Sequence, residues 1–429
     1  MGWLPIRVDQ RRVSEPGPAS AETPRRSGRA ATFAALGSPI YRRYWIGLVL
    51  YVLGHRAEYV TYAWLVWELT NDPLYLGYLG LAQGIPFVLL QPGGGVLADR
   101  TNRLWLLRAT TTCTGIVLTT AFALTVSGLA QVEHLLVLAT LGSIFRSFDD
   151  PSRQALLPQL IDRARLPNAV ALGSIPWQSG RVIGPSITGL LIALFGGPVG
   201  FGFGAAVTFA SLALYSRLRV PTARLTNGPG LRGELTEGLR FILGNYLFRS
   251  LIGLALFNSL FGMSYLTLLP IYADRYFEAG SEGYGLMQAA QGTGSVLATL
   301  TLATLAHRAK HRGVALLLGA AAFGLLLMAF SRSASLPLAL PILLLVGMSN
   351  TSCMTQINTV LQEKVPDHLR GRVLSAFTLC YNLVPFGGVL GGALAAAVDA
   401  RFAILLGGAL VAALALVLLG TNSRLRAVA

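Results

Sequence analysis

An apolar run near the start of the sequence contains three ionisable residues, His55, Arg56 and Glu58. On a helix that rises about 1.5 Å per residue, they lie about 15 to 20 Å beyond Trp45, near the centre of a bilayer. His55, Glu58 and Tyr62 share one helix face, whereas Arg56 lies about 200° from Glu58 and cannot pair with it. We therefore predict a proton site at His55 and Glu58, and for Arg56 a partner on another helix or an anion in a cavity. A structural ion network is the alternative, but ionisable groups at the midplane of a membrane are rarely retained without a function.

A second ionisable cluster closes the apolar run that begins near residue 133. Arg146 has Asp149 at i+3 and Asp150 at i+4, so an intrahelical ion pair is available. Arg153 extends this row. The two adjacent acids could transfer a proton, so both are candidates for proton coupling, but a cytoplasmic salt-bridge gate and a purely structural pair are each slightly favoured. Pro151 is expected to end or kink the helix.

The composition describes a membrane protein. A chain of 429 residues has the length of about two or three soluble domains, but 53% hydrophobic residues, 12% charged residues and a mean hydropathy of +0.58 place it in a bilayer. The formal charge of +15 does not indicate nucleic acid as a partner, because the basic residues are dispersed between apolar runs. The sequence contains no Walker loop, nucleophile elbow or metal-ligand spacing, and we therefore predict no enzyme, metal or cofactor.

Twelve apolar windows are each long enough to cross a bilayer as a helix of about 20 residues. The even number puts both termini on one side of the membrane. With that side as the cytoplasm, the positive-inside rule accounts for all but six of the 34 Lys and Arg residues. The windows run approximately over 45–70, 75–98, 104–128, 133–150, 169–195, 198–217, 248–273, 283–306, 313–331, 335–361, 373–397 and 401–420.

The chain divides into five parts. Residues 1–40 are predicted to be a disordered cytoplasmic tail, and 421–429 the cytoplasmic C-terminus. Two six-helix halves occupy 41–217 and 248–420, and 218–247 form a cytoplasmic linker between them. Four apolar residues in this linker recur near helical spacing and predict an amphipathic helix on the inner leaflet, with a simple tether as the favoured alternative: Leu231, Leu235, Leu239 and Ile242.

The two halves are related by a repeat at one offset. Ala-Gln-Gly at 82–84 recurs at 290–292, and Leu-Ala-Asp-Arg at 97–100 recurs as Leu-Ala-His-Arg at 305–308, both 208 residues later and without a gap. Parallel six-helix repeats place the substrate between them near the midplane. We therefore predict an all-α membrane protein with twelve transmembrane helices in two pseudo-symmetric halves.

The loop after the second window reads Gly94-Gly95-Val96-Leu97-Ala98-Asp99-Arg100-Thr101-Asn102-Arg103. It resembles the loop between helices 2 and 3 of the major facilitator superfamily, G-x-L-a-D-r-x-x-R. The resemblance implies a secondary transporter, with Gly95, Asp99, Arg100 and Arg103 as a cytoplasmic gate motif. A helix N-terminus suits the carboxylate, and lipid phosphates suit the two arginines. An ordinary cytoplasmic turn is the alternative.

A second motif lies in the fifth window, Gly180-Arg181-Val182-Ile183-Gly184-Pro185-Ser186-Ile187-Thr188-Gly189. It resembles the antiporter motif of the superfamily, G-x-x-x-G-P-x-x-G-G, with Thr188 replacing the first of the last two glycines. Gly180 and Gly184 stand one turn apart and allow another helix to approach closely, while Pro185 bends the helix. The resemblance implies export rather than uptake, with Gly189 completing the motif.

The resemblance narrows to the transmembrane secretion effector branch, which contains the enterobactin exporter and macrolide efflux proteins. Residues 148–158, 166–172 and 181–185 look like that branch, and 365–373 are similar to its loop before helix 11. Together with the first loop, the match covers most of the chain from about 41 to 420.

We therefore expect a proton-coupled exporter of a small hydrophobic or amphiphilic molecule, of drug, macrolide or siderophore type. It would work as a monomer in the cell membrane, with the substrate, protons and membrane lipids as partners. An uptake symporter or a lysolipid flippase of the same fold is the alternative, and a non-transporting receptor is less favoured. The cavity candidates, of which the neutral ones could instead form interhelical hydrogen bonds, are Arg56, Gln83, Arg146, Arg181, Asn258, Tyr265, Gln291, Gln356 and Asn382.

Asp99 is expected to face the start of helix 11, near Asp367 to Arg372, and to hold the halves together on the cytoplasmic side when the transporter opens outward. Asp99→Asn should then reduce the outward-open population. Distances between spin labels on the two halves would measure it, and an unchanged distribution would exclude this latch.

Overall fold

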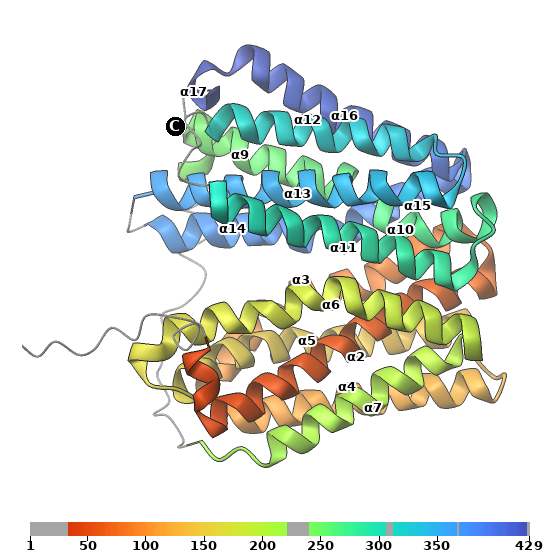
Figure 1. The fold of residues 1–429 in the computed structure, drawn as a ribbon, viewed down its shortest axis with the longest axis vertical. Helices are drawn as coiled ribbons and strands as arrows, with labels where there is room; N and C mark the ends of the chain where they lie inside the picture. Colours follow the sequence, from red (N-terminus) through yellow and green to blue (C-terminus); the bar gives the residue numbers. More distant parts are fainter. Residues whose placement is uncertain (1–32, 221–239, 306–311, 367–368, 427–429) are drawn as a thin grey trace, which may run out of the picture.

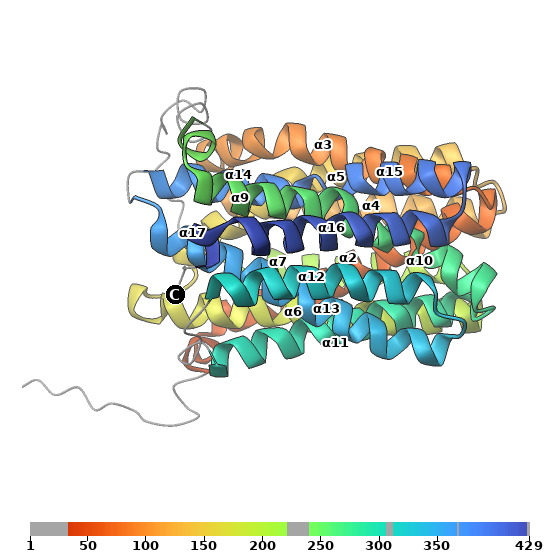
Figure 2. The same cartoon turned by 90° about the horizontal axis from the view of Figure 1, so that it is seen from above.

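The computed structural model describes residues 33–220, 240–305, 312–366 and 369–426, and all regular elements in these ranges are helical. The long helices run along one direction (Figures 1 and 2) and form two groups (Figure 1). The short helices η1 (Ala34–Gly37) and α17 (Ser423–Arg426) lie at the same end of the molecule, on the left in Figure 1. We call this the terminal end, and the opposite one the distal end.

The first half consists of six long helices joined by short connections. Side chains cap several of their starts: Ser38 precedes the first helix, Asp72 accepts the Leu74 N–H at 2.9 Å, and Asn102 accepts the Leu104 N–H at 3.0 Å. Two single turns, η2 (Leu157–Gln159) and η3 (Arg163–Arg165), connect the fourth helix to the fifth. The helices are α2 (Pro39–Thr70), α3 (Pro73–Arg100), α4 (Arg103–Val126), α5 (Val132–Leu156), α6 (Leu166–Phe195) and α7 (Pro198–Ser216).

The second half contains six spans, two of which are interrupted. Its first span comprises α9 (Tyr246–Phe257), the π-helical turn η4 (Asn258–Gly262), α10 (Tyr265–Ile271) and the π-helical turn η5 (Tyr272–Tyr276). Its fifth span breaks at Leu383, just before Pro385, into α14 (Arg370–Asn382) and α15 (Val384–Ala397). The other spans are α11 (Gly280–Leu305), α12 (Arg312–Ser331), α13 (Leu336–Lys364) and α16 (Ala400–Thr421).

These spans confirm the predicted fold class of twelve helices in two halves. Eight of them are long and apolar enough to cross a membrane on length and composition alone: α3, α4, α7, α9 to η5, α12, α13, α14 to α15, and α16. The remaining four, α2, α5, α6 and α11, carry more polar residues. All four contribute to the candidate site.

Pro151 does not end its helix, contrary to one of the two outcomes expected from the sequence, since α5 continues to Leu156. Proline has no N–H to donate to the carbonyl four residues earlier, which is that of Ser147. This carbonyl lies against Gly94 of α3, where the missing side chain leaves room for it. Close packing of a neighbouring helix thus accommodates the disturbed turn, as membrane-embedded prolines commonly require.

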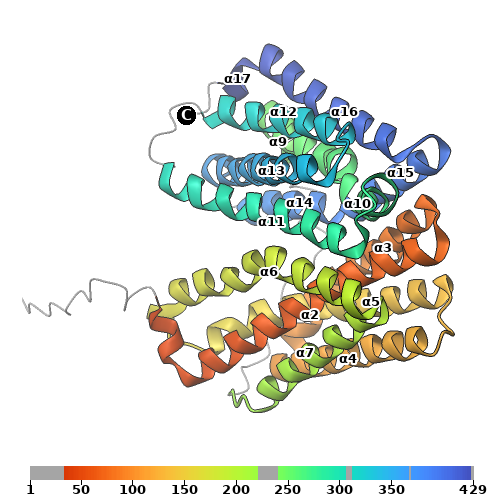
Figure 3. The same cartoon turned by 45° about the vertical axis from the view of Figure 1, so that its right-hand side comes forward.

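The two halves meet through small residues. A Cβ atom added to Gly392 of α15 would lie 2.7 Å from the Pro73 carbonyl oxygen of α3. One added to Gly285 of α11 would lie 2.6 Å from the Pro185 carbonyl oxygen of α6. The repeated Ala-Gln-Gly sequence serves this contact in both halves, since Gly84 packs on α15 and Gly292 packs on α6. Figure 3 shows α3 beside α15 and α6 beside α11. Backbone-to-backbone packing of this kind needs glycine at the contact.

Polar contacts between the halves also join them at the distal end. The Trp67 indole N–H donates to the Asp274 carboxylate at 3.0 Å, and the Arg275 guanidinium lies over the same indole ring, 4.6 Å from its centroid. Arg275 also donates to the Asn71 carbonyl at 2.8 Å. In Figure 1 the ribbons of the two halves converge at this end and diverge toward the terminal end.

Several sequence predictions fall outside the described residues. They include the Asp99 side chain, the first two residues (367–368) of the segment that it was expected to face, the repeat at 306–308, and most of the proposed amphipathic helix. Of that helix, Ile242 is described: it is buried, and it packs in a hydrophobic cluster with residues of α9 and α13.

Gly189→Val tests the small-residue contact between α6 and α11. A Cβ at Gly189 would lie 2.7 Å from the Ser281 carbonyl oxygen, well inside the ordinary contact distance of about 3.5 Å, so the two helices must separate. We expect longer distances between spin labels at Ser127 and Ser335, two exposed distal positions, in a cysteine-free background. Gly173→Val is the control on the same helix, because nothing lies within 4 Å of its Cβ position. Equal distances in both variants would show that the contact does not hold the distal end closed.

Candidate functional site

A cavity of about 400 Å³ lies between the two halves. Arg56 and Tyr59 of α2 and Gln178, Arg181 and Pro185 of α6 form one wall. The opposite wall combines amide and hydroxyl groups with apolar side chains: Gln288, Gln291, Asn350, Thr351 and Thr355, with Met263, Leu266 and Met354. Among the described residues that line the cavity, two are arginines and none is acidic. The cavity therefore has a cationic wall and a neutral wall.

The antiporter-like motif positions Arg56 at the cavity. Gly180 and Gly184 face α2, and a Cβ added to Gly184 would lie 2.9 Å from Cγ of Arg56. The absence of side chains at these glycines lets α6 lie against the aliphatic part of Arg56. Its Nε atom is buried and has no hydrogen-bond partner in the part of the chain that the structure describes. A buried donor of this kind is unfavourable unless a ligand or water satisfies it.

The other face of the same motif contacts the second half. The Pro185 carbonyl and Gly189 lie against Gly285 of α11, as described above. One segment of α6 therefore touches α2 within its own half and α11 across the interface.

His55, Glu58 and Arg146 lie together beside this cavity, in the first half. Arg146 Nη1 of α5 is 3.0 Å from Nδ1 of His55, and Nδ1 is 3.7 Å from Oε2 of the buried Glu58. Arginine can only donate, so Nδ1 accepts this hydrogen bond and carries no proton in this arrangement. Gly142 of α5 makes room for the Glu58 carboxylate, because a Cβ there would lie 2.9 Å from Oε1. His55 thus lies between Arg146 of α5, to which it is hydrogen-bonded, and Glu58 of its own helix.

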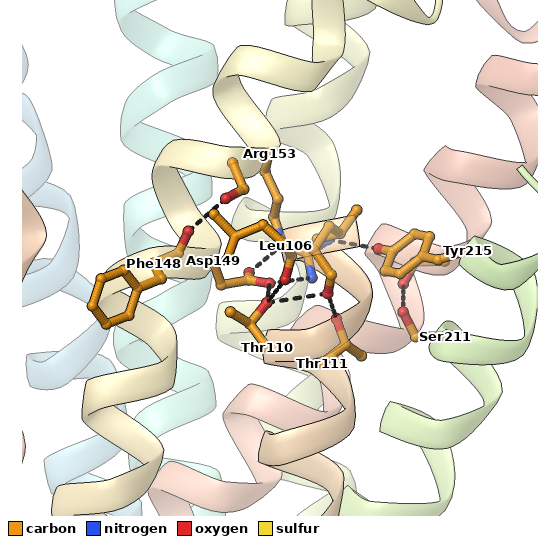
Figure 4. Close-up of polar contacts among 11 residues, drawn as sticks. Leu106, Thr110, Thr111, Phe148, Asp149, Arg153, Ser211 and Tyr215 are labelled. Carbon is orange, nitrogen blue, oxygen red and sulfur yellow. Dashed lines mark hydrogen bonds and ion pairs between the residues drawn. The ribbon is translucent and has the colours of Figure 1, made fainter. Parts of the chain in front are cut away.

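Asp149 pairs with Arg153 rather than with Arg146 (Figure 4). Both side chains are buried, and three other helices contribute to the cluster. Thr110 of α4 donates to Asp149 Oδ1 at 2.9 Å, and Arg153 donates to the Tyr215 hydroxyl of α7 at 2.6 Å. The guanidinium also lies 3.6 Å from the ring centroid of Tyr51 on α2. The pair is therefore saturated with partners and connects four helices at one level.

Asp150 occupies a different environment. It is half-buried and lines a second cavity of about 400 Å³ among α2, α5 and α6, together with Arg153 and Trp177. Adjacent acids on one helix thus face separate surroundings, because successive residues of a helix point about 100° apart. Asp149 is therefore held by its ion pair, whereas Asp150 faces a cavity.

The remaining candidates lie mainly in helix contacts. Of the nine cavity candidates, Arg56, Arg181 and Gln291 line the cavity. Asn258 donates to Asn350 at 3.0 Å, and Asn382 donates to Gln91 across the two halves at 2.8 Å. The others are placed as follows: the Gln83 carbonyl accepts from Ser143, Gln356 donates to Ser352 on its own helix, and Tyr265 is buried in the core.

Sequence reasoning missed several lining residues, including Tyr59, Gln178 and Gln288. Each stands three positions from a residue that was found, Arg56, Arg181 or Gln291, and so shares its helix face. This spacing was available in the sequence. Asn350, Thr351 and Thr355 had no such neighbour among the candidates.

Of the gate motif, Gly95 and Arg100 lie in the last turns of α3, and Arg103 begins α4. Arg103 donates to the Ala155 carbonyl near the end of α5 at 2.9 Å, and so joins two helices of the first half. Arg100 is exposed at the terminal end.

Comparison with known proteins places this architecture in a family. The family model described as transmembrane secretion effector matches residues 30–429, which is nearly the whole chain. The chain belongs to the transmembrane secretion effectors, a family of the major facilitator superfamily. Family and fold are those of membrane transporters and not of enzymes. Transporters of this superfamily bind small molecules and typically work as single chains, and the bacterial relatives of this one point to the cell membrane.

Three curated relatives are similar over much of their length. The staphyloferrin A transporter of Staphylococcus aureus is 26% identical, over 80% of this chain and 86% of that protein. The multidrug efflux pump Tap of Mycolicibacterium fortuitum is 27% identical, over 80% and 86%. The enterobactin exporter EntS of Shigella dysenteriae is 31% identical, over 70% and 71%.

Solved structures with the same fold include a bacterial homologue of the human lysosomal transporter Spinster and the nucleoside transporter NupG. The first aligns with a TM-score of 0.71 at 16% identity, over 90% of this chain and 98% of that one. The second aligns with a TM-score of 0.71 at 14% identity, over 90% and 99%. At these identities the likeness concerns the fold alone.

Asp149→Asn tests whether the Asp149–Arg153 pair stabilises the first half. The change leaves the Arg153 charge buried without its counterion, and we expect a loss of about 3 to 5 kcal/mol, seen as a lower unfolding midpoint of the detergent-purified protein. Asp162→Asn, at an exposed acid beyond α5, should have no effect. Replacement of both partners, Asp149→Leu with Arg153→Met, should cost less than the single change. A stable single variant would rule out a structural role for the pair.

Proposed function

We propose that the protein is a proton-coupled exporter of a small hydrophobic or amphiphilic compound, of drug, macrolide or siderophore type. The observation that carries the proposal is the cavity between the halves, with an ionisable group of three residues directly behind its cationic wall. The names of two relatives, an efflux pump and an exporter, support the outward direction. The antiporter-like motif supports it as well.

The terminal end is taken as the cytoplasmic side, in line with the distribution of basic residues. The halves pack together at the distal end, so the arrangement described here corresponds to a state that receives substrate from the cytoplasm. Residues 41–217 and 248–420 would then move as two bodies, with 218–247 as the cytoplasmic connection. The small-residue contacts at α3–α15 and α6–α11 are the surfaces that separate when the distal end opens.

Proton coupling would act through the choice of partner at His55. Unprotonated Nδ1 accepts a hydrogen bond from Arg146 and so links α2 to α5. A proton on Nδ1 removes this acceptor and places a positive charge beside the Arg146 guanidinium, while it strengthens the attraction to Glu58 at 3.7 Å. Proton uptake would therefore exchange a contact between helices for one within α2. A two-state transporter can use such a difference to favour one conformation over the other.

Glu58→Gln tests this coupling. The amide keeps the shape of the side chain but cannot take up a proton or attract a protonated His55, so efflux driven by a pH gradient should fall to the rate of vesicles without the protein. Everted vesicles expose the cytoplasmic face outward, so compounds are added outside and their accumulation in the acidic lumen is measured. The panel of compounds includes a macrolide, a tetracycline and a siderophore. Glu68→Gln, an exposed position on the same helix, should transport at the wild-type rate. Proton-driven efflux that survives Glu58→Gln at the wild-type rate would exclude the proposed role of Glu58.

A further inference from the structure

We infer that the central cavity binds an organic anion, with its acidic group held by Arg56 and Arg181 and its apolar body against the opposite wall. This inference deepens the proposed function and rests on it for the identity of the bound molecule as a transported substrate. The chemical class is a carboxylate, phosphate, sulfonate or phenolate attached to a hydrophobic body.

The lining of the cavity is positively charged. Arg56 and Arg181 lie on adjacent helices of one wall and are close enough to interact electrostatically, and Arg146 adds to the positive potential at Arg56. No acidic residue is among the described residues that line the cavity. Like charges in a poorly hydrated site are unfavourable, and an anion between them removes both the repulsion and part of the desolvation.

Glu58, two positions from Arg56 on α2, is used elsewhere. Glu58 is buried against Gly142 of α5 and faces His55, on the side of α2 that turns away from Arg56. It is therefore placed to exchange a proton with His55 and not to neutralise the cavity. The positive wall and the proton site are two separate features of the same helix.

A buried hydrogen-bond donor at the cavity lacks an acceptor. Nε of Arg56 is buried and has no hydrogen-bond partner in the described part of the chain, and the Gln288 amide lies on the opposite wall. Donors without acceptors call for a ligand that supplies oxygen atoms. Planar guanidinium groups are well suited to acidic oxygens, because they can donate two parallel hydrogen bonds.

The neutral wall indicates what the remainder of the ligand is like, apart from its acidic group. Met263, Leu266 and Met354 offer flexible apolar surface, and a volume of about 400 Å³ accommodates a body of one or two rings. An inorganic anion would leave this surface uncovered. The combination therefore favours an amphiphilic anion over a small ion or a neutral hydrophobic compound.

Binding of two probes of equal shape tests the inference. The full-length protein in phosphatidylcholine nanodiscs is titrated with 1-naphthaleneacetate and with its uncharged amide, 1-naphthaleneacetamide. We expect the wild type to bind the anion at least about tenfold more tightly, which corresponds to about 1.4 kcal/mol. Arg181→Gln should bring the two affinities close together by weakening the anion alone, and Arg181→Lys should retain part of the preference.

Two further variants guard against a change in folding. Arg56→Met keeps the aliphatic stem that packs on Gly184 and removes the charge, so it should also weaken the anion and leave the amide unchanged. Arg332→Gln removes an exposed arginine at the distal end and should change neither affinity. Unchanged binding of the amide in the cavity variants shows that the cavity itself is intact.

Equal affinities of the two probes for the wild type would overturn the inference, as would a preference that persists in both Arg181→Gln and Arg56→Met. Displacement of the anion by added phosphatidylglycerol would support the anion site and identify a lipid headgroup as one source of the ligand. The titration needs no pH gradient and no direction of transport. A failed efflux test at Glu58 with an intact anion preference would therefore overturn the proposed coupling and leave the anion site standing.

Discussion

A charged side chain inside a membrane-spanning bundle has lost its water, and the surrounding helices must supply its partners. This requirement organises the first half of the protein. The Asp149–Arg153 pair takes hydrogen bonds and ring contacts from α2, α4 and α7, and Arg146 of α5 bonds His55 of α2. These interactions fix α2, α4, α5 and α7 relative to one another within the first half.

The contact between the halves follows a different chemistry. Glycines of α6, α11, α3 and α15 lie against backbone atoms of the opposing half, and the charged contact at the distal end involves a rim of residues near Trp67. Separation of such surfaces uncovers little charge. A transporter that alternates between two states needs this division, with strong polar networks inside a half and weakly polar packing between halves. The cavity lies between the polar network of the first half and the packing surface of the second half.

The sequence was informative wherever the physics is local. Hydropathy located the spans, the shared offset of 208 revealed the repeat, and the spacing of His55 and Glu58 placed them on one face. It also identified Arg56, Arg181 and Gln291, which line the cavity. The sequence did not identify Asn350 or Thr351 as lining residues. Its spacing also made Arg146 a possible ion-pair partner of Asp149, whereas the structure pairs Asp149 with Arg153. Competing partners at similar spacing along one helix cannot be ranked without knowing which neighbours surround them.

Length and apolar periodicity therefore determined by themselves that this chain is a helical membrane protein, because both depend on residues close together in the chain. The two related halves followed from a comparison of segments 208 residues apart, which needs no knowledge of how the helices pack. Tertiary structure alone decided what each polar residue does. Arg56 faces a cavity, Arg146 reaches another helix, and Asn382 meets Gln91 from nearly 300 positions away. Burial and partnership depend on which helices pack together and at what rotation, and that arrangement results from the sum of many contacts between residues that are distant in the sequence.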